Sequence, residues 1–233
     1  MIREITTINL WENHFLLRGS GGVNCYLVRT DTGYVLIDSG LHARRGDLVR
    51  ELESAGCRPG NLSLIIVTHG DLDHIGNCAY LRDRYGAQIS AHPSEFEAVE
   101  SGNMTLNRKT RQGVVARTFL SLVSLFTKSD RLKPDLPVEE GCDLASHGFN
   151  AQVLHLPGHS LGSIGILTAG DDPETGSTPA LFCGDLLWNV SSPEPQPNQD
   201  APAALKASLA PVASLPIKTV YPGHGKPFLM SSR

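Results

Sequence analysis

The chain alternates short apolar runs, which suit buried strands, with stretches in which apolar residues recur at helical spacing. Residues 23–29 and 34–38 predict two strands, joined as a hairpin by the turn at 30–33. Residues 62–68 are almost continuously apolar, as expected of a strand that is covered on both faces. Between the second and third of these strands, residues 45–55 carry apolar side chains at helical spacing, which predicts a helix. This alternation of strands and helices predicts α/β layering.

The later part of the chain continues the same pattern. Further helices are predicted at 77–85, from 93 onwards and at 204–215, and further strands at 88–91, 150–156, 164–168, 180–183 and 218–221. The stretch 191–203 contains four prolines, and we expect it to be an exposed loop.

A polar stretch with four ligand-type residues follows the apolar run at 62–68. Its members are His69, Asp71, Asp73 and His74. Residues two apart point to opposite faces of a strand and to roughly opposite sides of a helix, so these groups converge only in a loop at the strand's carboxyl end. Imidazole nitrogens and carboxylate oxygens there suit zinc, iron or manganese. The alternative is a solvated polar loop without a ligand.

Three later turns favour the metal site over the solvated loop. Each follows an apolar, strand-like run, contains glycine, and presents one ligand-type residue: His159, Asp185 and His224. Four strand ends with ligand candidates form a much more specific signal than one short motif. Cys183 stands close to Asp185, but its apolar neighbours predict a small buried side chain and no ligand.

Composition and charge narrow the class of protein. The composition, 40% hydrophobic and 19% charged, is typical of a soluble globular protein. The 233 residues suffice for one large domain or two small ones, and we expect one domain over 1–233. The net charge of −4 argues against nucleic-acid binding. We see no secretory signal and no apolar run of about 20 residues that could span a membrane. Five scattered cysteines do not suggest a disulfide framework, so a cytoplasmic location is expected.

The stretch 104–133 differs from the rest of the chain and is predicted to be a helical insertion. It holds seven basic residues and one acid, a net charge of +6, so the remainder carries −10. Its centre, 114–126, is rich in Val, Leu and Phe. One hypothesis is a flap that attracts an anionic, amphiphilic small-molecule substrate. The alternatives are an ordinary surface helix with a basic face, or an interface, and a homodimer is one open assembly.

The order of these motifs resembles the metallo-β-lactamase superfamily, whose pattern is H-x-H-x-D-H followed by single His, Asp and His residues. The resemblance runs from the strand at 24–28 to the turn at His224, and it implies a four-layer αββα sandwich with metals at one edge of the two sheets. It implies a first metal on His69, Asp71 and His159, a second on Asp73, His74 and His224, and Asp185 as a bridge.

Two further features bear on the resemblance. An aspartate at the position of Asp38 would support the metal loop in that family, although a simple turn former is an equal alternative here. Glyoxalase II, in the same superfamily, has a helical domain beyond the last turn. We expect this chain to be a glyoxalase II-like core without that domain and without its substrate site.

The implied chemistry is hydrolysis by a hydroxide that bridges two divalent metals. The substrate would be an ester, thioester, lactone or phosphoester, and Asp73 would be the carboxylate that orients the water. No Gly-x-Ser-x-Gly motif is present, which argues against a serine nucleophile.

Asp71 is the one departure from the family pattern, since a histidine is usual there. Four neutral histidines and three aspartates contribute −3 against +4 from two divalent metals, which leaves +1; a histidine at position 71 would leave +2. The extra carboxylate favours harder metals, so iron and manganese are alternatives to zinc, the first choice. It also keeps open a non-haem iron oxidoreductase of the flavodiiron or persulfide dioxygenase kind. A metal-free binding module is the least favoured alternative.

Overall fold

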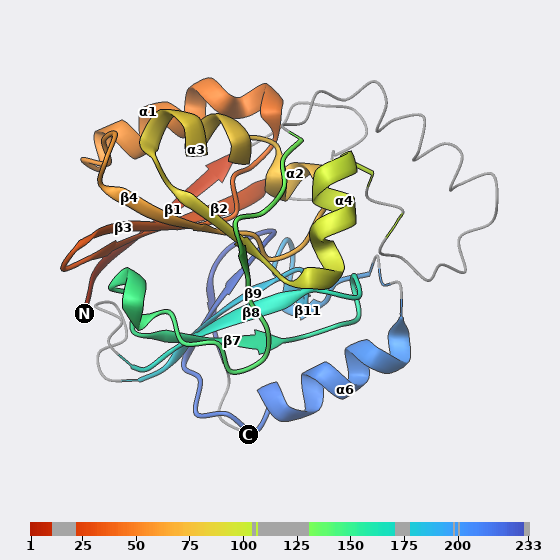
Figure 1. Ribbon diagram of the computed structural model, residues 1–233. Helices are drawn as coiled ribbons and strands as arrows, with labels where there is room; N and C mark the ends of the chain where they lie inside the picture. The colour runs from red at the N-terminus through yellow and green to blue at the C-terminus, as the bar shows by residue number, and fades with distance from the viewer. Residues whose placement is uncertain are drawn as a thin grey trace.

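Two β-sheets lie face to face in the centre of the molecule, and helices cover their outer faces (Figure 1). The computed structural model describes residues 1–10, 22–103, 106, 131–170, 178–197, 199 and 201–230. The predicted insertion at 104–133 lies almost entirely outside these residues and stays a prediction, as does the assignment of 1–233 to one domain.

The first sheet contains six strands that pair in chain order. They are β1 (Ile2–Leu10), β2 (Val23–Thr30), β3 (Gly33–Ile37), β4 (Leu62–Ile66), β5 (Gln88–Ala91) and β6 (Leu136–Pro137). The β1–β2 and β2–β3 pairs are antiparallel, and the predicted hairpin between β2 and β3 is present. From β3 to β6 the strands are parallel. Parallel neighbours need crossover connections, and α1 (Arg45–Ser54) and α3 (Cys78–Tyr85) lie in two of them.

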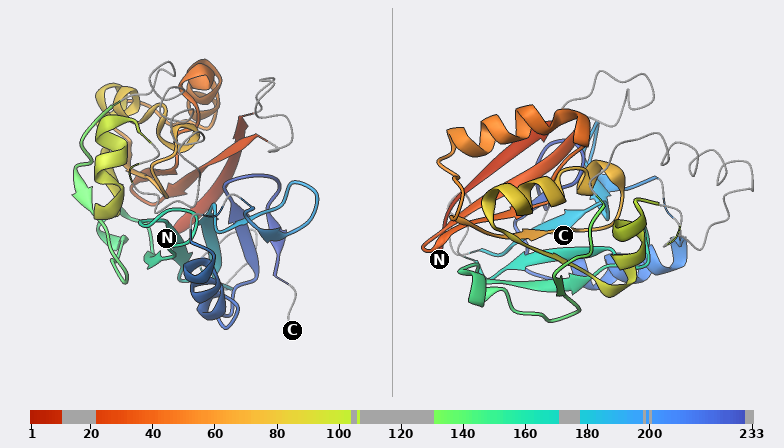
Figure 2. Two further views of the ribbon diagram at one scale, coloured as in Figure 1. Left: turned by 90° about the vertical axis from the view of Figure 1, so that its right-hand side faces the viewer. Right: turned by 45° about the horizontal axis from the view of Figure 1, so that its top comes forward.

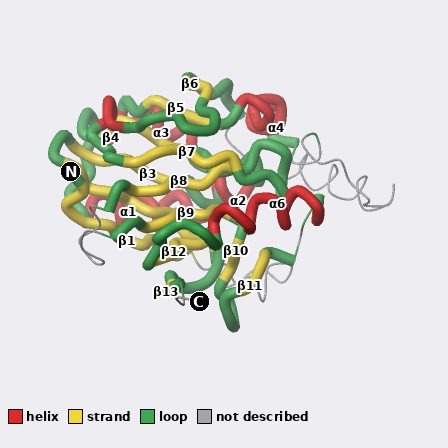
Figure 3. Tube along the Cα trace, turned by 90° about the horizontal axis from the view of Figure 1, so that it is seen from below, coloured by secondary structure: helices red, strands yellow, loops and turns green. Residues whose placement is uncertain are grey.

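The second sheet has five strands in the order β13-β12-β9-β8-β7. They are β7 (Ala151–His155), β8 (Ile164–Thr168), β9 (Ala180–Gly184), β12 (Thr219–Pro222) and β13 (Phe228–Leu229). Only the β9–β12 pair is parallel among these described strands. Two short strands, β10 (Leu187–Trp188) and β11 (Glu194–Pro195), form a separate hairpin after β9. Figure 3 shows this sheet from below.

The remaining helices are short, apart from one on the second sheet. They are α2 (Leu72–Ile75), α4 (Phe96–Ser101), α6 (Pro202–Val212) and the 3₁₀ turns η2 (His42–Arg44), η3 (Pro93–Glu95) and η4 (Ala145–His147). The predicted helix start at Pro93 is confirmed, and the helix expected at 204–215 begins and ends slightly earlier. Among the described helices, none has the length and apolar character needed to cross a membrane.

Three apolar cores separate four layers. On β2, Cys25 and Leu27 pack towards α1 and α3, whereas Tyr26 and Val28 face the second sheet, as the two-residue period of a strand requires. On the second sheet the side chains alternate in the same way between the inter-sheet core and the core under α6. Figure 2 shows the stacking from two other sides. The predicted αββα sandwich is therefore confirmed.

Candidate metal centre

The predicted metal loop begins where β4 ends and contains a one-turn helix. His69 precedes this turn, Asp71 occupies its N-cap in an extended conformation, and Asp73 and His74 lie within α2. The backbone N–H of His74 donates to the carbonyl of Asp71 at 2.9 Å. Because the backbone changes from extended to helical at Asp71, side chains that would point apart in a regular strand or helix can face the same point. The convergence that we expected of a loop is therefore achieved by a loop and a helical turn together.

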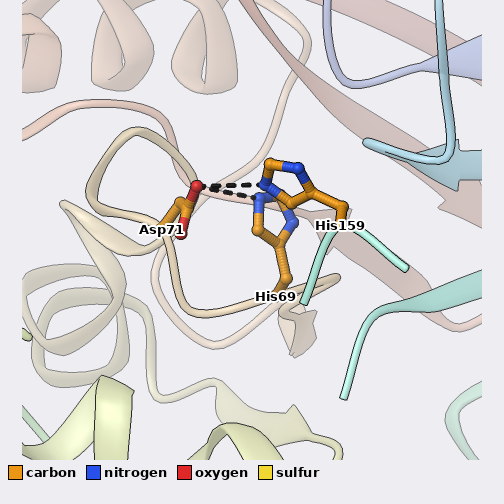
Figure 4. A group of neighbouring side chains, drawn as sticks. All are labelled: His69, Asp71 and His159. Atoms are coloured by element: carbon orange, nitrogen blue, oxygen red, sulfur yellow. Dashed lines mark hydrogen bonds and ion pairs between the residues drawn. The ribbon is translucent and has the colours of Figure 1, made fainter. Parts of the chain in front are cut away.

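The first set of side chains is His69, Asp71 and His159, whose ligand-type atoms all lie within 4.8 Å of one another. Asp71 Oδ2 lies 3.1 Å from His159 Nε2 and 3.7 Å from His69 Nε2 (Figure 4). His159 comes from the turn after β7, so the two sheets both contribute to this set.

The second set is Asp73, His74 and His224, again within 4.8 Å. Asp73 Oδ2 lies 3.5 Å from His224 Nε2 and 3.9 Å from His74 Nε2. Asp185, after β9, contacts both sets: its oxygens lie 3.6 Å from His74 Nε2, 3.4 Å from His224 Nε2 and 3.8 Å from His159 Nε2. All seven predicted site residues therefore meet at one edge of the sheets.

The donor atoms fit divalent metal ions. His69 Nε2, His74 Nε2 and Asp185 Oδ1 are buried without a hydrogen-bond partner among the described residues. Buried polar atoms without a partner cost about 1–3 kcal/mol each, so three of them at one point call for a ligand. Atoms that bind a tetrahedral ion at about 2.1 Å lie about 3.4 Å apart. The carboxylate-to-imidazole separations within the two sets, 3.1 to 3.9 Å, are close to that spacing.

Hydrogen bonds on the far side of the imidazole rings hold them in place. Asp38, at the end of β3, accepts from His74 Nδ1, from the Thr68 backbone N–H and from the Thr68 hydroxyl, each at 2.8 Å. Asp38 is the one non-glycine residue with positive φ (+59°) among the described residues, so it is a turn residue as well as a support. His224 Nδ1 lies 2.8 Å from the carbonyl of Gly22. Such partners orient metal ligands and fix their tautomer.

The buried charges of the centre shift one another's pKa. Burial alone lowers the pKa of His74, but the neighbouring carboxylates, Asp38 foremost, outweigh it and hold that pKa well above its usual value. Burial also lowers the pKa of His224, and Asp185 outweighs it and raises the value to about 9. Burial raises the pKa of Asp185, whereas the imidazoles of His224 and His74 hold it well below its usual range. The carboxylates thus make the centre attractive to positive charge, whether protons or metal ions.

Three residues around the centre were not singled out by the sequence. Glu95 is buried and accepts hydrogen bonds from both ligand-bearing loops of the first set. Gln196 lies in the stretch expected to be an exposed loop, yet it is buried and its Nε2 donates to Asp185 Oδ2 at 2.9 Å. Asn24 donates to the carbonyls of Pro222 and Gly225. Polar residues outside any ligand motif carry no local signal for such contacts.

The remaining candidates behave as ordinary structural residues. Cys183 is buried, as predicted, and burial raises the pKa of its thiol to about 12. The rings of His92 and His155 stack on each other with centroids 4.2 Å apart. His42 is half-buried in η2 and, among the described residues, belongs to none of the three metal-type groups.

Comparison with known proteins places the chain in a family. The family model described as the metallo-beta-lactamase superfamily matches residues 18–224. The hydroxyacylglutathione hydrolase GloC of Haemophilus influenzae is 30% identical over 166 residues, which are 71% of this chain and 66% of that protein. A hydroxyacylglutathione hydrolase of Pseudomonas paraeruginosa is also 30% identical, over 70% of this chain but only 47% of its own length. The chain therefore spans about half to two thirds of the length of these relatives.

Solved structures agree with this placement. TTHA1623, solved in a di-iron-bound form, is 30% identical with a TM-score of 0.67, and the match covers 96% of this chain and 94% of that one. BJP-1, a subclass B3 metallo-beta-lactamase of Bradyrhizobium japonicum, shares the fold with a TM-score of 0.66 at 21% identity, over 88% of this chain and 73% of that one. The chain belongs to the metallo-beta-lactamase superfamily, and at that level it resembles metal-dependent hydrolases.

Proposed function

We propose that the protein is a dinuclear metal-dependent hydrolase. The observation that carries this proposal is a set of buried donor atoms, on His69, His74 and Asp185, that have no hydrogen-bond partner among the described residues and lie where all seven side chains meet. In this proposal His69, Asp71 and His159 hold one ion, Asp73, His74 and His224 hold the other, and Asp185 bridges them.

Residues around the proposed ions have different roles in the reaction. Two divalent cations, when bound, would supply an acidified water as nucleophile and would stabilise the negative charge that develops on the substrate. Asp73 is the most exposed of the seven side chains, at 21%, so it can meet both solvent and substrate. We assign it the role of accepting a hydrogen bond from the attacking water and orienting it. Asp185 is held from behind by the Gln196 amide.

A thioester of the hydroxyacylglutathione type is the proposed substrate, and this proposal departs from the expectation that the substrate site of glyoxalase II is absent. Two relatives named hydroxyacylglutathione hydrolase, each 30% identical, support this class over the ester, lactone and phosphoester alternatives. Such thioesters are anionic, and the basic stretch 104–133 would favour an anion in a chain whose remainder carries −10.

Zinc is the proposed metal, and iron is the alternative with a specific observation behind it. The Asp71 carboxylate adds negative charge beside His159, and TTHA1623 was solved in a di-iron-bound form. A di-iron centre would make an oxidoreductase the second candidate function.

The test is metal analysis combined with an activity screen. Protein purified without added metal is expected to contain two zinc ions per chain and to cleave a hydroxyacylglutathione thioester, with loss of the thioester absorbance. Chelator-treated protein and the Asp185→Ala variant serve as controls. Iron together with oxygen-dependent thiol oxidation would favour the oxidoreductase, and protein that binds no metal would refute both functions.

A further inference from the structure

Glu95 is a charged residue in a place where charge is costly. Its side chain belongs to η3, the turn that leads into α4, and the residue is only 1% exposed. Moving a carboxylate out of water costs several kcal/mol unless hydrogen bonds replace the lost hydration. The position of Glu95 therefore depends on the donors that surround it.

These donors come from two loops that carry proposed metal ligands. Glu95 Oε2 accepts the backbone N–H of Gly70 at 2.8 Å. Its Oε1 accepts the hydroxyl of Ser160 at 2.7 Å and the backbone N–H of Gly162 at 2.8 Å. Gly70 stands between His69 and Asp71, and Ser160 directly follows His159. The Glu95 carboxylate thus links, by hydrogen bonds, the two chain segments that supply the whole first set, residues 69, 71 and 159.

Two glycines allow this close approach. A Cβ atom on Gly70 would lie 3.0 Å from Glu95 Oε2 and 2.9 Å from the Ala98 side chain. A Cβ on Gly162 would lie 2.8 Å from Glu95 Cγ. Both backbones pack against the carboxyl group at a distance that a side chain would prevent, so the contact is built into both loops.

The second set has a different support. Asp38 contacts His74 directly and reaches His69 only through Thr68, whose hydroxyl lies 3.0 Å from His69 Nδ1. Glu95 bonds to Gly70, which is flanked by two ligands of the first set, and to the segment that carries His159. Asp73 and His74 follow Gly70 in the same loop but lie within α2, and His224 lies on a third segment. Of these two carboxylates, Glu95 is the one that links the His69–Asp71 segment to the His159 segment, which together supply the first set.

We propose that Glu95 is a positioning residue for the first metal set and that its loss loosens one ion selectively. The inference rests on the proposed dinuclear function. Outer hydrogen-bond partners of metal ligands are typically worth 10–100-fold in metal affinity. Here the partner acts on the backbone of the ligand loops, so it sets the separation of His69 and Asp71 from His159 across the two sheets.

The Glu95→Gln variant removes this support with little change in volume. An amide has one acceptor oxygen, and its NH₂ group cannot accept from an N–H donor. If the oxygen keeps Ser160 and Gly162, the NH₂ group faces the Gly70 N–H and that bond is lost. The matched control is Glu97→Gln, because Glu97 is exposed on the same helical segment.

The measurement is stepwise removal of zinc by a chelator, with metal content and circular dichroism followed together. Wild-type protein is expected to hold two zinc ions. In Glu95→Gln, one ion should leave at roughly tenfold or more lower chelator concentration and the other should be retained as in wild type. Glu97→Gln should match wild type. Ser160→Ala, which removes one of the three bonds, should weaken the same ion by a smaller factor, and it serves as the test if Glu95→Gln does not fold.

Combining Glu95→Gln with each of two ligand variants identifies which ion is lost. In His224→Ala, which lacks a ligand of the second set, Glu95→Gln should weaken the remaining ion. In His159→Ala, which lacks a ligand of the first set, Glu95→Gln should leave the remaining ion unchanged. If Glu95→Gln weakens the binding of both ions equally, or weakens the binding of neither ion, the inference is wrong. In that case two zinc ions in wild-type protein would still support the proposed function. Failure of wild-type protein to bind two metal ions would instead refute the proposed function.

Discussion

At the scale of single residues, the directions of the His74 and His224 imidazoles follow from the partners of their far nitrogens. A carbonyl oxygen only accepts hydrogen bonds, so Nδ1 of His224 must donate to Gly22, and Nε2 of the neutral ring is left with a lone pair. The carboxylate of Asp38 has the same effect on His74. In both rings the Nε2 lone pair points to the centre. A proton on Nδ1 and a free lone pair on Nε2 define the tautomer that a metal ligand requires here.

Removing a proposed ligand should remove metal without unfolding the protein. Asp185→Ala and His159→Ala each delete a side chain on a turn after a strand, outside the three apolar cores. We expect loss of at least one ion and a fall in activity of more than about 100-fold, since even outer partners of ligands contribute 10–100-fold. Metal content and circular dichroism are the measurements. Full metal occupancy with full activity in both variants would refute the dinuclear centre.

The proposed ligand Asp71 would lower the net charge of the metal-loaded centre. Asp71→His would raise the net charge with two divalent ions from +1 to +2, so we expect selectivity to shift from iron and manganese towards zinc. The greater positive charge should also move the acidic limb of the pH–rate profile to lower pH, because it lowers the pKa of the water that is activated. Competition between metals and the pH dependence of kcat test this. If neither changes, Asp71 acts only as the N-cap of α2.

At the scale of elements, strand β2 holds the last metal turn in place across the two sheets. Asn24 Nδ2 donates to the carbonyls of Pro222 at 2.8 Å and Gly225 at 2.7 Å, and the Tyr26 hydroxyl donates to Pro222 at 2.6 Å. These bonds flank His224. The orientation of that histidine therefore depends on a strand about 200 residues earlier in the chain.

Asn24→Ala should destabilise this junction more than Tyr26→Phe. The first change leaves the carbonyl of Gly225 without the Asn24 donor, at a cost of about 1–3 kcal/mol, whereas in the second Asn24 still serves Pro222, and the cost is about 0.5–1.5 kcal/mol. Urea denaturation at matched metal content measures both. Equal losses of unfolding free energy in the two variants would contradict the expectation that Asn24 contributes more than the Tyr26 hydroxyl.

At the scale of the whole molecule, charge is distributed unevenly along the chain. The stretch 104–133 carries +6 and the remainder −10. Like charge on most of the surface repels an anionic substrate, and a local basic stretch can offset this near the site if it lies close enough. The location of this stretch relative to the metal centre falls outside the described residues, so kinetics must decide its role.

Reversing the charges at Arg108, Lys109 and Arg111 should raise KM for an anionic thioester by about tenfold at low salt. Added salt should shrink the difference, because exposed charges are screened beyond about 10 Å at 0.1 M ionic strength. A neutral ester is the matched substrate and should be hardly affected. If anionic and neutral substrates respond alike, this stretch does not select substrates and an ordinary surface helix is the better description.

The sequence by itself predicted the α/β layering, most of the longer strands and a set of ligand-type residues, because those depend on local patterns. It did not predict strand β1 (Ile2–Leu10), where charged and apolar residues are mixed, or the two-residue strands β6, β10, β11 and β13. A two-residue period shows which strand faces are buried, and a ligand-type residue on a glycine turn after an apolar run is visible within a few positions. The seven proposed ligands and the α/β layering were accessible in this way, and the family resemblance added the αββα sandwich and the grouping of the ligands around two ions.

Apart from Asp38, which the family resemblance implied, only the tertiary structure decided what holds those ligands in place. Glu95 meets Gly70 and Gly162 across 25 and 67 residues, and Asn24 meets Gly225 across 201. Gln196 is buried against Asp185 although its proline-rich surroundings predict an exposed loop. A single buried polar residue forms no period and no motif, since its partners are backbone groups that any sequence supplies. The separation of ligands and the support of each proposed ion are therefore properties of the packed sheets, where distant segments first become neighbours.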